Sequence, residues 1–153
     1  HTNDCGPFSA AIATNALRGA RVFEGALIAE AMVEQWPPER IPGWATFPWG
    51  VARMLRRFGL RPRWRIGASE RRLLRNLDAG RTTLVLVGEP LRFEGRRWAG
   101  WSHYKLLYAW GPEAGWAFVD PGASASRVYT YQKAATFRRL WTWMGRQCIE
   151  VED

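Results

Sequence analysis

Apolar residues recur at helical spacing in the first part of the chain, and Gly or Pro residues mark where each such stretch ends. The pattern predicts three helices, over about 5–18, 24–35 and 48–58. Gly19 suits the C-cap of the first helix, Pro37 stops the second, and Thr46 is a candidate N-cap for the third. The first part of the chain is therefore expected to be helical.

Beyond residue 60 the pattern changes to short runs of β-branched and aromatic residues separated by turn formers. These runs predict strands over about 61–66, 82–87, 103–110, 116–120, 127–131 and 147–151. Ser69 caps a short predicted helix that runs through Leu77, and another helix is expected over 133–142. Residues 88–101 are rich in Gly and Pro, so we expect a loop there that could fold over a site near residue 103.

Helices followed by antiparallel strands predict an α+β fold, in which N-terminal helices pack on an antiparallel β-sheet. The 153 residues are enough for one domain with a single sizeable core. No repeat, low-complexity tract or linker divides the sequence. We therefore expect one domain over residues 1–153.

One cysteine stands at the predicted start of the first helix. Asn3 or Asp4 can supply the N-cap oxygen there, and Pro7 suits the first helical turn. Gly6 removes side-chain bulk beside the sulfur of Cys5. The unsatisfied N–H groups and the positive end of the helix dipole favour a thiolate, so the position suits a nucleophile. The alternative is a buried, inert cysteine, which is the commoner role of a lone cysteine in a small domain.

A cysteine nucleophile needs a base, and the chain contains only two histidines. His1 is terminal, whereas His103 begins a predicted strand and Asp120 ends the next one. A turn over 111–115 makes these two strands a hairpin, which brings His103 beside Asp120. The carboxylate could accept the imidazole N–H and orient the ring toward a thiol. A structural histidine and a turn-forming acid before Pro121 are the alternatives.

The ordered set of a cysteine motif, a histidine and an Asp-Pro turn resembles the C39-like branch of the papain-like cysteine peptidases. The resemblance is carried by Asp4-Cys5-Gly6-Pro7, His103 and Val119-Asp120-Pro121. It extends over most of the chain, because 82–87 resembles the central strand of that family and Phe137 with Trp141 resembles its following helix. The resemblance implies a papain-like fold, no cofactor, and Cys5, His103 and Asp120 as nucleophile, base and orienting acid.

One feature of the papain-like enzymes is missing from the sequence. Those enzymes generally carry a glutamine a few residues before the cysteine, and its amide helps to bind the oxyanion. The sequence begins at His1 and has no glutamine before Cys5. We therefore expect either a fragment that lacks its true N-terminus or an incomplete oxyanion site. The backbone N–H of Cys5 could donate one hydrogen bond, and loss of a single oxyanion donor costs roughly 3 kcal/mol.

The aromatic content suggests where a substrate could lie. The chain has 10 tryptophans, and several of them fall in Gly- and Pro-rich stretches near the predicted site. Trp98 and Trp101 are candidates for a substrate groove, although packing under loops is the common role of such residues. Strand alternation puts Lys105 on the face of His103, where it could bind an acidic substrate group or reach solvent at the sheet edge.

The remaining composition excludes several classes of function. The net charge is +8, but the arginines are spread over several elements without a nucleic-acid motif, so we expect a solvated basic surface and no nucleic-acid partner. No apolar run reaches the roughly 20 residues that a membrane span needs, and no signal peptide is visible. The Cys and His spacing does not fit a zinc site. Cys148 is expected to be a buried strand residue, although a disulfide with Cys5 is possible on number alone.

These observations predict a cysteine peptidase or a related amide-bond hydrolase that works through an acyl-enzyme. Two alternatives remain open. The same residues could serve an acyl transferase, in which an amine outcompetes water. A module of the same fold could also bind peptides without catalysis, and Cys5 would then be inert.

Overall fold

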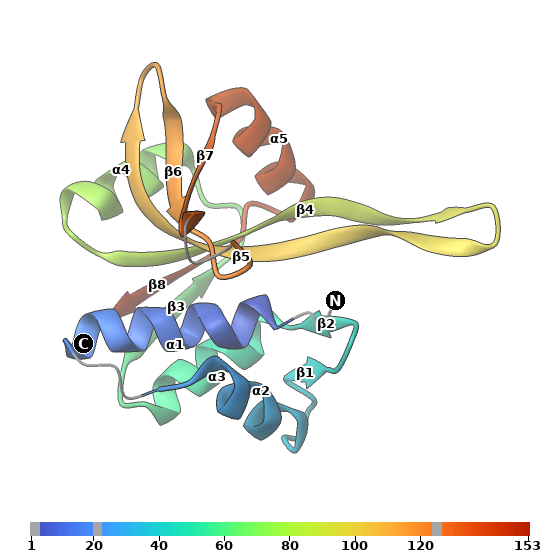
Figure 1. Cartoon of the computed structure of the whole chain (residues 1–153). Helices are drawn as coiled ribbons and strands as arrows, with labels where there is room; N and C mark the ends of the chain where they lie inside the picture. Colours follow the sequence, from blue (N-terminus) through green and yellow to red (C-terminus); the bar gives the residue numbers. More distant parts are fainter. Residues whose placement is uncertain (1–3, 20–22, 124–126) are drawn as a thin grey trace.

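A computed structural model describes residues 4–19, 23–123 and 127–153 of the chain, shown in Figure 1. The described residues form five helices and eight strands. These are α1 (Cys5–Arg18), α2 (Gly25–Val33), β1 (Arg40–Ile41), β2 (Ala45–Thr46), α3 (Pro48–Arg57), β3 (Arg61–Arg65), α4 (Glu70–Asp78), β4 (Thr82–Glu94), β5 (Arg97–Gly111), β6 (Gly115–Val119), β7 (Tyr129–Gln132), α5 (Ala134–Trp143) and β8 (Cys148–Glu152).

Six of the strands form one antiparallel sheet in the order β3-β8-β4-β5-β6-β7. The strand β8 comes last in the sequence but lies between β3 and β4. The two short strands β1 and β2 pair with each other apart from this sheet. The predicted α+β architecture, with N-terminal helices on an antiparallel sheet, is confirmed.

The sheet is buried on both faces, and β4 shows how the sequence achieves this. Leu84 and Leu86 pack in a cluster with the helices α1, α2 and α3, whereas Val85 and Val87 pack in a second cluster with α4 and α5. Successive side chains of a strand point to opposite faces, so a continuous apolar run supplies both cores. In the described part of the chain, no helix is long and apolar enough to cross a membrane.

The strongest local signals placed their elements accurately. The helix α1 has the predicted bounds, and Gly19 ends it in the left-handed conformation with a φ of 61°. Ser69 caps α4, because its hydroxyl accepts a hydrogen bond from the backbone N–H of Arg72. The predicted strands and the other helices are present, with ends that shift by up to seven residues.

The prediction of a loop over 88–101 is wrong. Both strands of the β4–β5 hairpin continue past the sheet and form a long two-stranded arm, which Figure 1 shows projecting beyond the helices. At Gly88, inside β4, a side chain would collide with the backbone of Trp101 on the partner strand, so this close strand pairing requires a glycine. Gly95 turns the arm with a φ of 62°. These glycines mark close strand approach and a tight turn rather than a loop.

The expected N-cap of the third helix is also wrong. Thr46 belongs to β2, where it is paired with Arg40 of β1. The N-cap of α3 is Phe47, whose side chain has no group that could accept a hydrogen bond from the helix. Pro48 occupies the first position of α3, where its missing N–H leaves no helical hydrogen bond unmade. The proline, rather than the threonine, is therefore the start signal of α3.

Candidate active site

The thiol of Cys5 lies at the first residue of α1, half-buried and not in a disulfide. The N-cap residue is Asp4, but its side chain makes no capping hydrogen bond and instead forms an ion pair with Arg40 of β1. Asn3 lies outside the described residues. Gly6 is buried against Thr46, so its missing side chain lets the start of α1 pack on β2. These contacts tie the start of the helix to the β1–β2 hairpin.

The structure brings His103 and Asp120 together, as the hairpin geometry predicts. The Nε2 atom of His103, in β5, lies 2.6 Å from Oδ1 of Asp120, which directly follows β6. The Cys5 side chain also lies close enough to the ring to raise its pKa. Because Nε2 faces the carboxylate, Nδ1 is the ring nitrogen that remains for the sulfur.

The surroundings of His103 favour its protonated form. Burial lowers the pKa of the ring, but the hydrogen bond to Asp120 and the interactions with the nearby Cys5 and Asp120 groups outweigh burial and raise the pKa from 6.5 to about 9. The ring is therefore an imidazolium at neutral pH. An imidazolium beside a thiol is the arrangement that stabilises a thiolate.

Asp120 is held by more than the histidine. Its Oδ2 lies 2.9 Å from the ammonium of Lys105, and its Oδ1 accepts the backbone N–H of Gly122 at 2.9 Å. Burial raises the pKa of this carboxyl, but the hydrogen bonds from His103 and Lys105 outweigh it and hold the pKa well below the usual range. The carboxylate therefore stays charged while His103 gains or loses a proton.

The structure corrects the expectation for Lys105. Its side chain does share a side of β5 with His103, but it is only 8% exposed and its ammonium binds Asp120, so it neither reaches solvent nor offers a charge to a substrate. The sequence suggested an acidic substrate group or solvent as the partner of this cation, and its pairing with Asp120 was not foreseen. The partner that buries it is the carboxylate beside the imidazole.

A groove of about 410 Å³ includes Ser102, the residue before His103, among its lining residues, although His103 itself does not line it. Trp101, 45% exposed, lines this groove together with Trp44, Leu91 and Met144. Lys105 is not among the lining residues. Trp98 lies in β5, but its side chain falls outside what the structure describes.

Gly122 is a site residue that the sequence argument missed. A Cβ atom there would lie 3.1 Å from Cε1 of His103 and 3.4 Å from Oδ1 of Asp120. Glycine is therefore the residue that lets the chain close over the ring while its N–H binds the carboxylate. The Pro-Gly pair after Asp120 is the signal in the sequence, but by itself it indicates only the end of a strand.

The second cysteine is structural, as expected. Cys148 lies in β8, is buried and forms no disulfide. Burial and the negative charge of Glu150 raise the pKa of its thiol to about 12. Within the described ranges, no group of three or more His, Cys, Asp or Glu residues could hold a metal ion.

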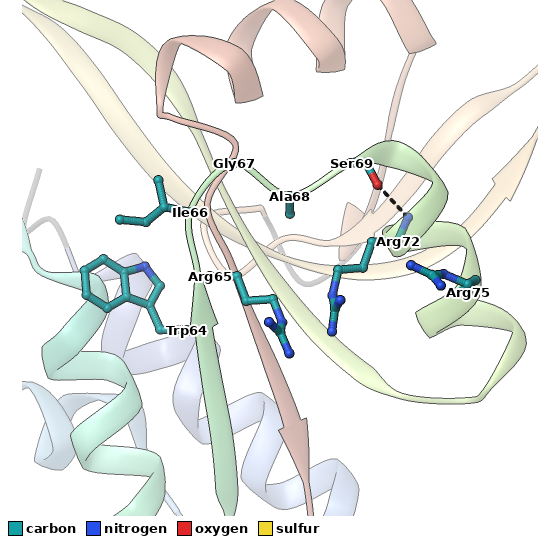
Figure 2. Close-up of a pocket in the computed structure, with 8 residues that line it drawn as sticks. All are labelled: Trp64, Arg65, Ile66, Gly67, Ala68, Ser69, Arg72 and Arg75. Carbon is teal, nitrogen blue, oxygen red and sulfur yellow. Dashed lines mark hydrogen bonds between the residues drawn. The ribbon is translucent and has the colours of Figure 1, made fainter.

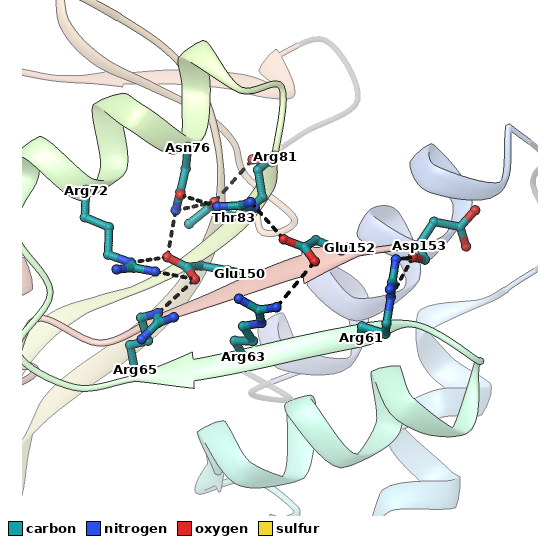
Figure 3. A network of polar contacts seen from close by, with 10 residues as sticks. All are labelled: Arg61, Arg63, Arg65, Arg72, Asn76, Arg81, Thr83, Glu150, Glu152 and Asp153. Atoms are coloured by element: carbon teal, nitrogen blue, oxygen red, sulfur yellow. Dashed lines mark hydrogen bonds and ion pairs between the residues drawn. The ribbon is translucent and has the colours of Figure 1, made fainter.

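The arginines are more than a solvated surface, which corrects a second expectation. Glu150 of β8 is 1% exposed, and its carboxylate binds Arg65 of β3 and Arg72 of α4 (Figure 3). Asn76 of α4 donates a further hydrogen bond to the same carboxylate. Neighbouring pairs join Arg63 and Arg81 to Glu152. Part of the positive charge therefore fixes β8 between its neighbours.

Comparison with known proteins identifies the fold. No family profile and no curated protein sequence matches the chain. A C39-like peptidase from Bacillus anthracis superposes with a TM-score of 0.73 at 14% identity, covering 99% of this chain and 89% of that one. The peptidase domain of Streptococcus ComA, a bifunctional ABC transporter of a quorum-sensing pathway, superposes with a TM-score of 0.62 at 21% identity, covering 97% and 90%. The chain has the fold of the C39-like peptidases.

Proposed function

We propose that this chain, with its C39-like fold, is a cysteine peptidase or a closely related amide-bond hydrolase. Cys5 is the nucleophile, His103 is the base, and Asp120 orients the ring. The observation that carries the proposal is the arrangement around His103, which bonds Asp120 through Nε2 at 2.6 Å and has the Cys5 side chain close enough to raise the pKa of its ring. Each partner alone has a structural explanation, but the three together have the order and contacts of a nucleophile, a base and an orienting acid.

Acylation follows from this arrangement. His103 takes the proton of the Cys5 thiol, and the resulting thiolate sulfur attacks the amide carbonyl carbon, so that the carbonyl electron pair moves to the oxygen. The imidazolium then donates its proton to the amide nitrogen. The carbon–nitrogen bond breaks, the amine departs, and a thioester remains on Cys5.

Deacylation reverses the proton transfer. His103, now neutral, accepts a proton from water as the water oxygen attacks the thioester carbon. The tetrahedral intermediate collapses and expels the thiolate, which restores the thiolate–imidazolium pair and releases a carboxylic acid. Asp120 stays ionised throughout and stabilises the imidazolium.

The start of α1 supplies the oxyanion donor in this proposal. The first N–H groups of a helix have no intrahelical partner, and Cys5 is the first residue of α1. Its N–H can therefore donate to the developing oxyanion, at the positive end of the helix dipole. The substrate chain on one side of the scissile bond would lie in the groove lined by Trp101 and Trp44.

Alkylation kinetics test the reactive pair directly. The rate of iodoacetamide labelling of Cys5 is measured at pH 6.5 by mass spectrometry in the wild type and in His103→Ala. A free thiol of ordinary pKa is only about 1% thiolate at this pH, so removal of the imidazolium should slow labelling by up to about a hundredfold. Cys148 is the internal control, because its buried, raised-pKa thiol should stay unlabelled in the folded chain.

Peptide cleavage is then tested on a peptide library prepared from a digested proteome, with Cys5→Ala as the inactive control. New peptide ends that require Cys5 support the hydrolase. If an added amine such as hydroxylamine or glycinamide is incorporated in preference to water, the chain is an acyl transferase instead. If Cys5 reacts no faster than glutathione at pH 6.5 and no ends appear, the catalytic proposal fails and the peptide-binding module replaces it.

A further inference from the structure

A second pocket lies away from Cys5, at the end of β3. It has a volume of about 450 Å³ and is bounded by the C-terminal end of β3, the connection that follows and the first turns of α4. Figure 2 shows the side chains of Arg65, Arg72 and Arg75 gathered on one side of this pocket and those of Trp64 and Ile66 on the other. We call it the arginine pocket. The mechanism above makes no use of it.

The arginine pocket carries an excess of positive charge. Arg65 and Arg72 share one carboxylate, that of Glu150, so two guanidinium groups face a single negative charge. Among the residues that the structure describes, no carboxylate pairs with Arg75. Ser69 already occupies an N–H group at the start of α4, so the guanidinium groups rather than the helix end provide the attraction. The pocket therefore suits a ligand with negative groups.

The edge of the sheet gives the pocket two chemically different sides. The strand β3 pairs with β8 alone, and no described strand covers its other edge. Trp64 pairs with Ile149, whose side chain faces α1–α3, and Arg65 pairs with Cys148, whose side chain faces α4 and α5. Side chains alternate along a strand, so apolar groups lie on one side of this edge and cationic groups on the other.

A row of aromatic rings links the arginine pocket to the groove lined by Trp44 and Trp101. Ring centroids lie 6.1 Å apart for Trp44 and Phe47, 4.3 Å apart for Phe47 and Trp49, and 6.3 Å apart for Trp49 and Trp64. Trp44 lines the groove, and Trp64 lines the arginine pocket. The end rings are therefore less than about 17 Å apart, a span that roughly five residues of extended chain cover.

We propose that the edge of β3 is an exosite for an extended segment of the polypeptide substrate. The segment places carboxylates in the arginine pocket and apolar side chains over Trp64 and Ile66. An extended chain directs successive side chains to opposite sides, so its sequence alternates acidic and apolar residues. The inference rests on the proposed function, because the aromatic row connects the arginine pocket to the groove in which that proposal places the substrate.

Binding of short synthetic peptides tests the exosite. The probe is a fluorescein-labelled peptide with the alternating order Leu-Glu-Leu-Glu-Leu between glycines, titrated with the Cys5→Ala chain and followed by fluorescence anisotropy. Two matched peptides carry Gln in place of Glu, or the same residues in the block order Leu-Leu-Leu-Glu-Glu. We expect the alternating acidic peptide to bind about tenfold more tightly than either, because two charge-assisted contacts and two apolar contacts form together.

Two variants locate the binding. Arg75→Glu should remove the preference for Glu over Gln, because it places a negative charge in the arginine pocket. Arg71→Glu makes the same charge change on α4 at an exposed position outside the pocket and should keep the preference. Trp49→Ala should weaken binding of a peptide that is extended by two leucines toward the groove, whereas Trp143→Ala on α5 should not.

Three results would overturn the exosite: equal affinity for the Glu and Gln peptides, equal affinity for the alternating and block orders, or equal losses in Arg75→Glu and Arg71→Glu. The Cys5→Ala chain cannot form a thioester, so none of these measurements depends on catalysis. Tight alternating binding without any Cys5-dependent cleavage would defeat the proposed function and leave a peptide-binding edge. Cleavage without an alternating preference would defeat the exosite alone.

Discussion

Two buried carboxylates, Asp120 and Glu150, are held by similar forces but have different partners. Asp120 binds the imidazole of His103 and the ammonium of Lys105, whereas Glu150 binds the guanidinium groups of Arg65 and Arg72. In both cases burial raises the carboxyl pKa and the hydrogen bonds outweigh it. The pKa of Glu150 falls to about 2, and that of Asp120 lies well below its usual range.

The difference lies in whether a partner can release a proton. A guanidinium stays charged at any pH at which the protein folds, so the Glu150 cluster can only hold β3, β8 and α4 together. The imidazole of His103, with a pKa of about 9, can release its proton in mildly alkaline solution, and it lies beside a thiol. The same buried ion-pair physics therefore stabilises structure at one carboxylate and supports proton transfer at the other.

The largest expected effect is on stability at the Glu150 cluster. Glu150→Gln leaves two guanidinium groups without their counter-charge, and breaking a buried pair in this way lowers the free energy of unfolding by about 3–5 kcal/mol. Urea denaturation followed by tryptophan fluorescence measures it. Glu152→Gln, on the same strand but partly exposed, is the matched control and should cost less than about 1 kcal/mol. Equal losses in the two variants would show that the buried cluster has no special role.

The pH dependence of stability should be dominated by His103 between neutral and mildly alkaline pH. Its pKa is 6.5 in an unfolded chain and about 9 in the folded one, so the folded state binds the extra proton. This stabilisation is complete below pH 6.5 and is lost as the pH rises through about 9, a change on the order of 3 kcal/mol. His103→Gln should flatten the urea-denaturation profile over this range. An unchanged slope would mean that the ring is neutral in the folded protein.

Asp120→Asn should separate charge from geometry at the site. The amide oxygen can still accept the ring N–H, but the negative charge that favours the imidazolium is gone. We expect iodoacetamide labelling of Cys5 at pH 6.5 to slow by about tenfold. The Glu152→Gln chain, which loses one carboxylate far from the thiol, should label at the wild-type rate. If Asp120→Asn also labels at the wild-type rate, the negative charge of Asp120 does not contribute to the reactivity of Cys5.

The smallest effect is expected for Gly122→Ala. The added methyl group would lie 3.1 Å from Cε1 of His103, so the ring must shift slightly, at a cost of about 1 kcal/mol. Labelling of Cys5 should slow by a small factor. Gly111→Ala is the matched control, because its added methyl group would meet only the Cβ of Ala114 at 3.9 Å. A Gly111→Ala chain that labels as slowly would point to a general effect on the hairpin.

The sequence was most informative at positions where a residue determines the conformation or the hydrogen bonding of the backbone close to it in the chain. Gly19 can end α1 because glycine accepts a positive φ, and Ser69 can cap α4 because its hydroxyl reaches a nearby N–H. The pairing of His103 with Asp120 was also predictable, because a hairpin fixes which residues of its two strands meet.

The features that sequence reasoning missed depend on residues that are distant in the chain. Gly88 looked like a loop residue, and its role is set by the backbone of Trp101 across the hairpin. The arginines looked solvated because their partner, Glu150, comes more than seventy residues later. Lys105 likewise looked exposed, because its ion pair with Asp120 forms only when the two strands of the hairpin come together. Tertiary contacts, rather than local propensity, decide these positions.

The central place of β8 has a consequence for how the protein is made. Residues 148–152 are synthesised after the other strands of this sheet, yet they fill the gap between β3 and β4. Until they emerge from the ribosome, both of those strands present an unpaired edge, and unpaired edges invite association with other chains. The helices can form as soon as they are synthesised, but the sheet closes only after β8 has been synthesised. We therefore expect the nascent chain to depend on chaperones most strongly just before β8 appears.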